Sequence, residues 1–413
     1  MNFLRRHQRK LYIIIFIATT IFFGWLIWKL FFSSSTTEIL LPEETATNNG
    51  SLPSAGPNSG QGDNSGGSGL LPESGNLDVV NPDKPDTIAV GGVTETTSVT
   101  NSRTLAATSS KNGGIQYYDK NDGTFYRVRD DGQVEKISDK VFYNVDNVTW
   151  APDKNQAVIE YPDGSNIYYN FNSDKQVTLP SYWEEFSFSP NSQEIVAKSI
   201  GLDVENRWLT VADTDGSNAI NLERIGNNAD KVYSSWSPNN QMVAMYTKGI
   251  DGTRQNLYFV GLNDENFKST IIEGRGFESQ WSGDGKKLIY SVYNANSQYK
   301  PELWVVDASS DNIGGNRKKI NLETWASKCT FSSNTEMYCA VPNDLADAAG
   351  MFPELAEKSE DNIYKINIQT GSKEKIASPD GSYNISQMSV SDSGEYLYFT
   401  DSSSEKIYKI KLK

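Results

Sequence analysis

The segment "WSPNNQMVAMY" (residues 236–246) decides the fold, because the chain repeats its pattern. An aromatic residue precedes a short turn, and a run of apolar, strand-forming residues follows the turn. Proline presets one backbone dihedral angle of such a turn, and asparagine tolerates a left-handed one. The same pattern recurs at six anchor residues: Trp150, Phe188, Trp236, Trp281, Phe331 and Val390.

Successive anchors are 38, 48, 45, 50 and 59 residues apart. Periods of about 40–50 residues that contain four strand-like runs are typical of β-propeller blades. One unit reads "VYSSW", "MVAMYT", "NLYFVGL" and "KSTIIEG", and β-branched and aromatic residues fill these runs as half-buried strands favour. The sequence therefore predicts an all-β propeller of four-stranded antiparallel blades, with seven blades favoured and six as the alternative.

The two ends of the repeat array are irregular. Residues 103–138 lack the proline turn and are interpreted as a degenerate first blade, and the last blade stops at "EKIYKIKLK" after three strands. We expect a segment near Thr104–Thr108 to supply the missing outer strand and close the ring. The anchor rings are interpreted as filling the wedge between neighbouring blades. Aromatic platforms for sugars or bases are the alternative.

The N-terminal segment differs in charge from the rest of the 413-residue chain, whose formal net charge is -14. Residues 1–32 contain Arg5, Arg6, Arg9, Lys10 and Lys29 and no acid, so the remainder sums to -14 - 5 = -19. So acidic a body repels nucleic-acid phosphates, which argues against a nucleic-acid partner.

Residues 11–32 are nearly all apolar and are long enough to span a bilayer as a helix. A cleaved signal peptide is the alternative, but its apolar region is usually shorter. The basic residues in segment 1–10 predict a cytoplasmic N-terminus by the positive-inside rule. We therefore expect a single-pass cell-membrane protein in which everything after residue 32 is extracytoplasmic.

Residues 33–103 are rich in Ser, Gly, Asn and Pro, as in "NNGSLPSAGPNSGQGDNSGGSGLLPESGN". Such a segment buries too little apolar surface to offset chain entropy, so we expect a disordered linker. Residues 104–413 are assigned to the propeller.

The Ser-Pro turns flanked by Trp and apolar strands resemble the TolB-type, WD40-like (PD40) propeller repeat of bacterial envelope proteins. The resemblance covers about 300 residues, and it is specific for architecture rather than function. Stretches such as "NADKVYSSWSPNNQMVA", "GRGFESQWS" and "TWASKCTFSSNTEMYCAVP" also resemble a group of membrane-anchored bacterial propellers. TolB is a periplasmic binding partner of other envelope proteins. This chain has a predicted membrane helix and linker where TolB has a separate N-terminal domain.

The single histidine, His7, precedes the predicted membrane helix. A Ser-His-Asp hydrolase, a Cys-His protease and a His-ligated metal site are therefore excluded from the propeller. We predict no catalytic residues, no cofactor and no metal. Glycoside hydrolysis by paired carboxylates remains the enzymatic alternative; the acids considered for it are Glu184, Glu185, Asp203, Glu205 and Glu278.

Two acidic segments, "YDKNDGT" (118–124) and "ADTDGSN" (212–218), resemble fragments of calcium loops. A complete loop needs ligands at alternating positions and a terminal glutamate. Asp-Gly turns between strands are therefore the favoured interpretation.

Cys329 and Cys339 flank the turn "SSNTE" in the sixth repeat. Antiparallel pairing about this turn brings both residues opposite one another on the same face, where cross-strand β-carbons are close enough for a disulfide. Two buried free thiols are the alternative.

An insertion, "PNDLADAAGMFPELAEKSE" (342–360), interrupts the same repeat. We expect Asp344 to cap a helical turn over residues 345–349, and Met351 and Phe352 to form an apolar tip that ends at a helix-breaking proline. Loops on rigid scaffolds often carry binding surfaces. The candidate partner-binding residues are Leu345, Met351, Phe352 and Glu354. Alternatively, Met351 and Phe352 fold back to cover the mouth of the ring.

The sequence thus predicts a tethered, non-enzymatic scaffold that recognises another envelope protein. Binding or trimming of cell-wall glycan is the alternative function, and a purely structural spacer is a third possibility.

Overall fold

The computed structural model describes residues 84–111 and 113–413, together with Thr19, Thr20, Phe22, Phe23, Trp25 and Lys29. Those last six residues are helical. The predicted cytoplasmic segment, the rest of the predicted membrane helix and residues 33–83 of the predicted linker lie outside the described residues. Within the part of the chain that the structure describes, no helix is both long and apolar enough to cross a membrane.

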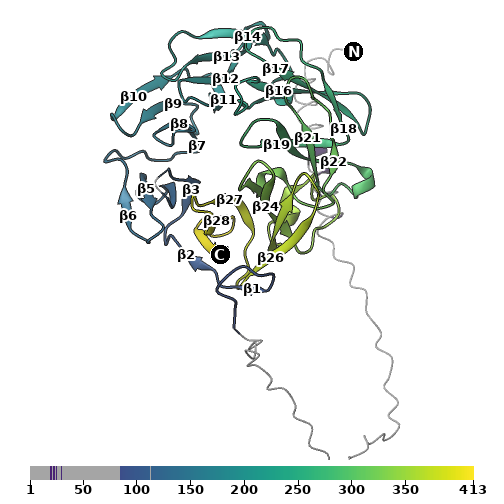
Figure 1. Ribbon diagram of the computed structural model, residues 1–413. Coiled ribbons are helices and arrows are strands. Elements are labelled where there is room, and N and C mark those ends of the chain that lie inside the picture. The colour runs from purple at the N-terminus through teal and green to yellow at the C-terminus, as the bar shows by residue number, and fades with distance from the viewer. Residues whose placement is uncertain (1–18, 21, 24, 26–28, 30–83, 112) are drawn as a thin grey trace, which may run out of the picture. The chain divides into compact units, whose positions relative to one another are not determined.

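Residues 93–411 form seven sheets that follow one another around a ring, and within each sheet the strands pair antiparallel except for β1 (Val93–Thr94) with β26 (Lys373–Pro379) (Figure 1). The chain is therefore a seven-bladed propeller, and the six-bladed alternative is wrong. Blades are numbered here from the first complete sheet. Blades 1–4 comprise β3 (Thr104–Ser109), β4 (Ile115–Asp119), β5 (Thr124–Val128), β6 (Val134–Lys136); β7 (Asn147–Trp150), β8 (Gln156–Glu160), β9 (Asn166–Asn170), β10 (Lys175–Leu179); β11 (Trp183–Phe188), β12 (Glu194–Ile200), β13 (Arg207–Asp213), β14 (Ile220–Arg224); and β15 (Val232–Ser234), β16 (Ala244–Gly249), β17 (Gln255–Val260), β18 (Thr270–Ile272).

Blades 5–7 follow the same order, and blades 6 and 7 each take one additional strand from the beginning of the propeller. Five short 3-10 helices lie in the connections between the described strands. Blades 5–7 comprise β19 (Arg275–Trp281), β20 (Lys287–Tyr293), β21 (Glu302–Asp307), β22 (Lys318–Lys319); β23 (Cys329–Phe331), β24 (Glu336–Pro342), β25 (Asp361–Asn367), β26 (Lys373–Pro379); and β27 (Ile385–Val390), β28 (Tyr396–Asp401), β29 (Ile407–Lys411). The 3-10 helices are η1 (Val204–Asn206), η2 (Ala229–Lys231), η3 (Ala295–Ser297), η4 (Ala326–Lys328) and η5 (Pro353–Ala356).

Two short strands close the ring. β2 (Thr97–Ser98) pairs antiparallel with β29 and becomes the fourth strand of blade 7, while β1 (Val93–Thr94) pairs parallel with β26 at the edge of blade 6. An N-terminal closing strand was predicted, but its position was wrong, because Thr104–Ser109 form the first strand of blade 1. Residues 93–98, assigned to the linker, therefore belong to the propeller. Two-residue strands carry no alternating pattern by which the sequence reveals them.

In blades 3, 4, 5 and 7 a buried serine holds the turn that follows the anchor residue. The Oγ of Ser237, a fully buried residue, accepts hydrogen bonds from the backbone amides of Gln241 and Met242 at 3.1 and 2.9 Å. Asn240, in the same turn, has a left-handed φ of 59°. Ser189, Ser282 and Ser391 accept equivalent bonds in blades 3, 5 and 7. The repeated turn is thus fixed by one buried hydroxyl group.

The anchor rings lie between neighbouring blades, as the wedge interpretation predicts. The indole nitrogen of Trp150 in blade 2 donates to the Ala106 carbonyl of blade 1 at 2.8 Å. The indole nitrogen of Trp281 in blade 5 donates to Ser235 of blade 4 at 3.0 Å. These two rings therefore join neighbouring sheets by packing and by a hydrogen bond, and the packing explains why an aromatic residue recurs at the position.

Candidate functional site: the blade-six loop and the adjacent pocket

The blade-six loop, residues 343–360, joins β24 to β25 and is held in place by contacts with the rest of the propeller. Leu345 is 6% exposed and packs against Trp325, Ala349 and Ala356. The backbone amides of Ala348 and Gly350 donate to the carbonyls of Gln298 and Tyr299 in blade 5, both at 2.8 Å. Because a β-carbon on Gly350 would meet the Tyr299 carbonyl at 2.6 Å, this close approach requires glycine. The loop is therefore anchored to the neighbouring blade.

The solvent-facing side of the loop carries exposed apolar side chains. Met351, Phe352 and Leu355 are 42%, 48% and 50% exposed, and Tyr299 of the adjoining blade-five loop is 41% exposed. We call these four residues the apolar tip. Met351 and Phe352 thus both remain exposed on an anchored support.

The local secondary structure of the loop differs from the prediction. Residues 345–349 contain turns but no helix, and Asp344 caps none. The helical turn is η5, which begins at Pro353 and not before it. Proline is well tolerated at the first position of a helix because that amide has no helical hydrogen-bond partner. The predicted helix-breaking residue therefore starts the helix.

The four predicted partner-binding residues separate into two groups. Met351, Phe352 and Glu354 are exposed on or beside the tip, whereas Leu345 belongs to the core beneath it. Leu345 is a poor candidate for a binding contact, because its side chain supports the loop instead. Leu355 and Tyr299, which the sequence analysis overlooked, join the exposed group.

A pocket of about 260 Å³ opens beside the loop and is lined by residues of blades 5, 6 and 7. Pro353, Ala356 and Glu357 of the loop form one wall. The remaining lining residues come from the first strands and the segments next to them: Glu278, Trp325, Ser327, Lys328, Asn384, Ser386 and Ser402. We call this cavity the loop pocket.

Lys328, which lines the loop pocket, forms a buried ion pair. The ammonium group of Lys328 lies 2.8 Å from Oδ2 of Asp361, and the two side chains are 9% and 0% exposed. Oδ2 also accepts a hydrogen bond from the backbone amide of Ile385 in blade 7 at 2.6 Å. Burial raises the pKa of Asp361, and the Lys328 charge opposes this effect. The pair therefore joins η4, β25 and β27 through groups that have little contact with solvent.

Glu278 lines the same pocket from β19. Its Oε2 accepts a hydrogen bond from the Ser327 hydroxyl at 2.8 Å. Burial raises the pKa of Glu278, and hydrogen bonds from Ser327 partly offset the change. Carboxyl groups with raised pKa values in clefts are candidates for proton transfer or for binding.

The other acids considered for glycoside hydrolysis lie elsewhere. The Glu185 carboxylate contacts the ammonium group of the buried Lys198, which also donates to the carbonyls of Ala229 and Val232 at 2.9 and 3.2 Å. Glu205 forms an ion pair with Arg224 at the outer edge of blade 3. Glu184 and Asp203 are exposed and do not line the loop pocket. Of the five acids, Glu278 is the one that lines the loop pocket.

Both acidic segments with calcium-loop character are hydrogen-bonded turns. Asp213 accepts bonds from Ser217 and Asn218, and Asp215 forms an ion pair with Lys175 at 2.8 Å. Among the described residues there is no group of three or more His, Cys, Asp or Glu side chains suited to holding a metal ion.

Cys329 and Cys339 lie directly opposite one another on β23 and β24, with α-carbons 4.0 Å apart, and form a disulfide. Both residues are buried in the core cluster that blades 5 and 6 share. The bridge therefore stabilises the sheet that carries the blade-six loop.

No protein-family model matches the sequence, and no curated protein matches it either. Solved structures do resemble the chain. A streptogramin B lyase structure matches with a TM-score of 0.50 and 10% identity over 76% of this chain and 94% of that chain. Oligogalacturonate lyase from Vibrio parahaemolyticus gives a TM-score of 0.48 and 10% identity over 77% and 93%. The Cps50 (Swd1) propeller domain from Myceliophteria thermophila gives 0.49 and 10% over 77% and 100%. At this identity the similarity concerns the fold alone.

Proposed function

We propose that this protein is a non-enzymatic, protein-binding β-propeller of the cell envelope, and that the blade-six loop carries its docking surface. The observation that supports this most is the apolar tip, in which Met351, Phe352, Leu355 and Tyr299 are each 41–50% exposed on an anchored support. Clustered apolar residues exposed on a soluble surface commonly mark interaction sites.

The rigid support beneath the tip favours binding. Packing of Leu345 and the two backbone hydrogen bonds to blade 5 order the loop before any partner arrives. A preordered surface loses little conformational entropy on association, so more of the interaction energy appears as affinity.

The charge around the tip indicates the chemistry of the partner. The loop contains five acids against one lysine, Lys358; the acids are Asp344, Asp347, Glu354, Glu357 and Glu360. A complementary partner presents an apolar recess rimmed by Lys or Arg side chains, and the opposite charges raise its association rate.

The location in the envelope is part of the proposal. The apolar segment 11–32 would anchor the chain, and residues after it would lie outside the cytoplasm. The Cys329–Cys339 disulfide supports this location, because such bonds persist mainly in oxidising compartments. Tethering would raise the local concentration of the propeller near membrane-bound partners. The resemblance to TolB-type repeats is consistent with a binding role.

In-cell crosslinking of the full-length protein followed by mass spectrometry tests the proposal. We expect an envelope protein to crosslink next to residues 351–355, and the double variant Met351→Ser/Phe352→Ser to lose it. Tyr143→Ser is the matched control, because Tyr143 is 70% exposed far from the loop in sequence. An unchanged set of crosslinked proteins in the double variant would refute a docking role for the tip.

The loop pocket supports the alternative function, recognition of cell-wall glycan. It combines two carboxyl groups, Glu278 and Glu357, with the Trp325 ring in one cavity. Carboxyl groups and aromatic rings are suited to binding sugars, and paired carboxyls can also hydrolyse glycosidic bonds. Retention of the wild-type protein, but not of Glu278→Gln, on purified cell-wall material would favour this alternative. The glycan alternative would be excluded if the wild-type protein were not retained on cell-wall material and the Met351→Ser/Phe352→Ser variant lost its crosslinks.

A further inference from the structure

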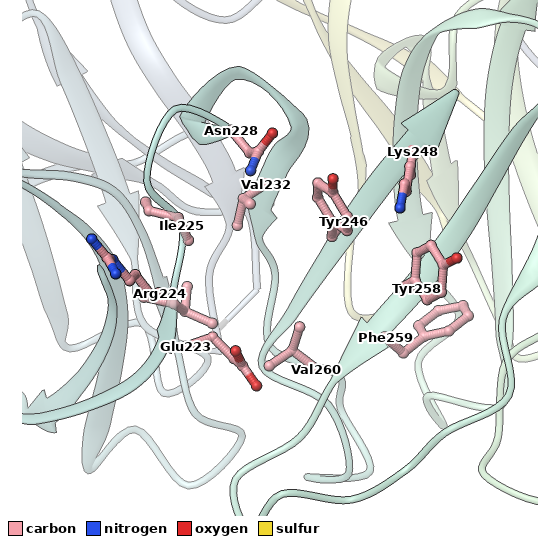
Figure 2. A pocket seen from close by; sticks show the side chains of 11 residues that line it. Glu223, Arg224, Ile225, Asn228, Val232, Tyr246, Lys248, Tyr258, Phe259 and Val260 are labelled. Atoms are coloured by element: carbon pink, nitrogen blue, oxygen red, sulfur yellow. The ribbon is translucent and has the colours of Figure 1, made fainter. Parts of the chain in front are cut away.

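A second cavity lies away from the blade-six loop, in the groove between blades 3 and 4 (Figure 2). Its volume is about 490 Å³, within the range of about 300–1,000 Å³ that is usual for sites of small ligands. Its floor is apolar and includes the buried side chains of Leu209, Ile225 and Val232.

The groove exists because the outer strand of blade 4 is short. β18 pairs only with Gln255, Asn256 and Leu257 of β17. The second half of β17, from Tyr258 to Val260, therefore has no outer strand neighbour among the described residues. β14 and the segment that follows it in blade 3 form the opposite wall.

Besides Arg224, five polar side chains line this cavity: Glu223, Asn228, Tyr246, Lys248 and Tyr258. Within residues 84–413 none of the five is assigned a side-chain hydrogen bond or ion pair. Arg224 differs, since its guanidinium group is paired with Glu205. A comparable cross-strand pair in blade 1, Tyr117–Tyr126, also differs, because the Tyr126 hydroxyl donates to Asp122 at 2.6 Å.

The charged side chains of Lys248 and Glu223 lie on opposite walls of the cavity. Figure 2 shows Lys248 beside the two tyrosines of blade 4 and Glu223 on the opposite wall. Tyr246 and Tyr258 lie opposite one another on β16 and β17, with ring centroids 5.9 Å apart. An ammonium group and two phenolic hydroxyls can all donate to one anion, while a carboxylate accepts from a cation.

We infer that this groove binds a small zwitterion with an apolar body, of the size of an apolar amino acid or dipeptide. The ligand carboxylate lies at Lys248 and the tyrosine hydroxyls, the ligand ammonium group lies at Glu223, and its side chain covers the apolar floor. This site is independent of the proposed docking function of the blade-six loop.

Isothermal titration calorimetry of the full-length protein tests the inference with L-leucyl-L-phenylalanine, its C-terminal amide, its N-acetyl derivative and free L-phenylalanine. Removal of either ligand charge should weaken binding about tenfold to a hundredfold, because each charge makes a charge-assisted hydrogen bond. Lys248→Met should lower the affinity for the free dipeptide by the same factor. In this variant the dipeptide and its C-terminal amide should then bind equally well. Glu223→Gln should likewise abolish the effect of N-acetylation.

Lys268→Met is the matched control, because Lys268 is an exposed lysine of the same blade that lies outside the groove. Tighter binding of free phenylalanine than of the dipeptide would still support the site and fix its length at one residue. Equal affinities of the charged and blocked ligands would overturn the inference. So would an unchanged affinity in Lys248→Met, or the absence of binding by both free ligands at about 10 mM. Crosslinking at the blade-six loop should remain intact in both groove variants, which separates the two proposals.

Discussion

The ammonium group of Lys328 and the carboxylate of Asp361 are 2.8 Å apart and almost completely removed from solvent. Asp361 also accepts a hydrogen bond from the backbone amide of Ile385 in blade 7. The pair thus joins two blades at the point where the blade-six loop leaves the sheet.

Loss of one partner of this pair should destabilise the propeller strongly. Lys328→Met leaves a buried, uncompensated carboxylate, and breaking a buried pair in this way typically costs about 3–5 kcal/mol. The double variant Lys328→Met/Asp361→Asn should recover part of the loss, because no buried charge remains. Denaturant unfolding of the wild type and both variants measures these differences. Equal stability of the single variant and the wild type would show that solvent reaches the pair.

The Glu278 carboxyl should make stability depend on pH. Burial raises its pKa in the folded state, so the folded protein binds the proton more tightly than the unfolded chain does. The protonated Glu278 carboxyl therefore contributes most to the free energy of unfolding below the pKa that it has in the unfolded chain. This contribution is lost as the pH rises through the higher pKa of the folded state. Glu278→Gln should gain melting temperature relative to the wild type at neutral pH, and the gain should vanish below about pH 4. A gain that is the same at every pH contradicts the assignment.

The two closing strands should be needed for a stable ring. A chain that begins at Thr104 lacks β1 and β2 and exposes the edge of β29, where Ile407 and Ile410 are now buried. We expect its melting temperature to fall by at least about 5 °C relative to a chain that begins at Lys84. Equal melting temperatures would mean that the described pairing contributes little.

Leu345 and Met351 should behave in opposite ways, although both are apolar residues of one loop. Leu345→Ala should reduce the free energy of unfolding by about 2–5 kcal/mol, since it opens a cavity against Trp325 and Ala356. Met351→Ala should change it by less than about 0.5 kcal/mol, because the side chain is exposed. Chemical denaturation distinguishes the two, and similar losses would contradict the assignment of the tip.

The propeller fold was largely predictable because short sequence features that repeat in each blade determine it. The anchor Trp236 and the turn from Ser237 recur with blade spacing, and each needs only its neighbours in sequence to be recognised. The closing strand was not predictable in position. Thr97 pairs with Lys409, which lies more than 300 residues away in sequence. The strand contains only two residues, so it shows no alternation of apolar and polar side chains.

The candidate site was predictable only where the pairing is local. The spacing of Cys329 and Cys339 about one turn was sufficient to place them opposite one another. Leu345 and Met351 look alike in sequence, and the packing of Leu345 against Trp325, which lies outside the loop, decides which of them is buried. Glu278 was likewise indistinguishable from the other acids, because its burial depends on η4 and blade 6.

The position of β1 and β2 also has a mechanical consequence. The chain enters the ring through Val93–Thr94 and Thr97–Ser98, which pair with strands of two different blades. Any tension on the N-terminal chain is therefore transmitted first to the strands that lock the circle. Because β1 belongs to the sheet of blade 6 and β2 to the sheet of blade 7, the pull acts on two neighbouring sheets. If residues 11–32 are an anchor, the two closing strands also carry the mechanical attachment of the propeller to the membrane.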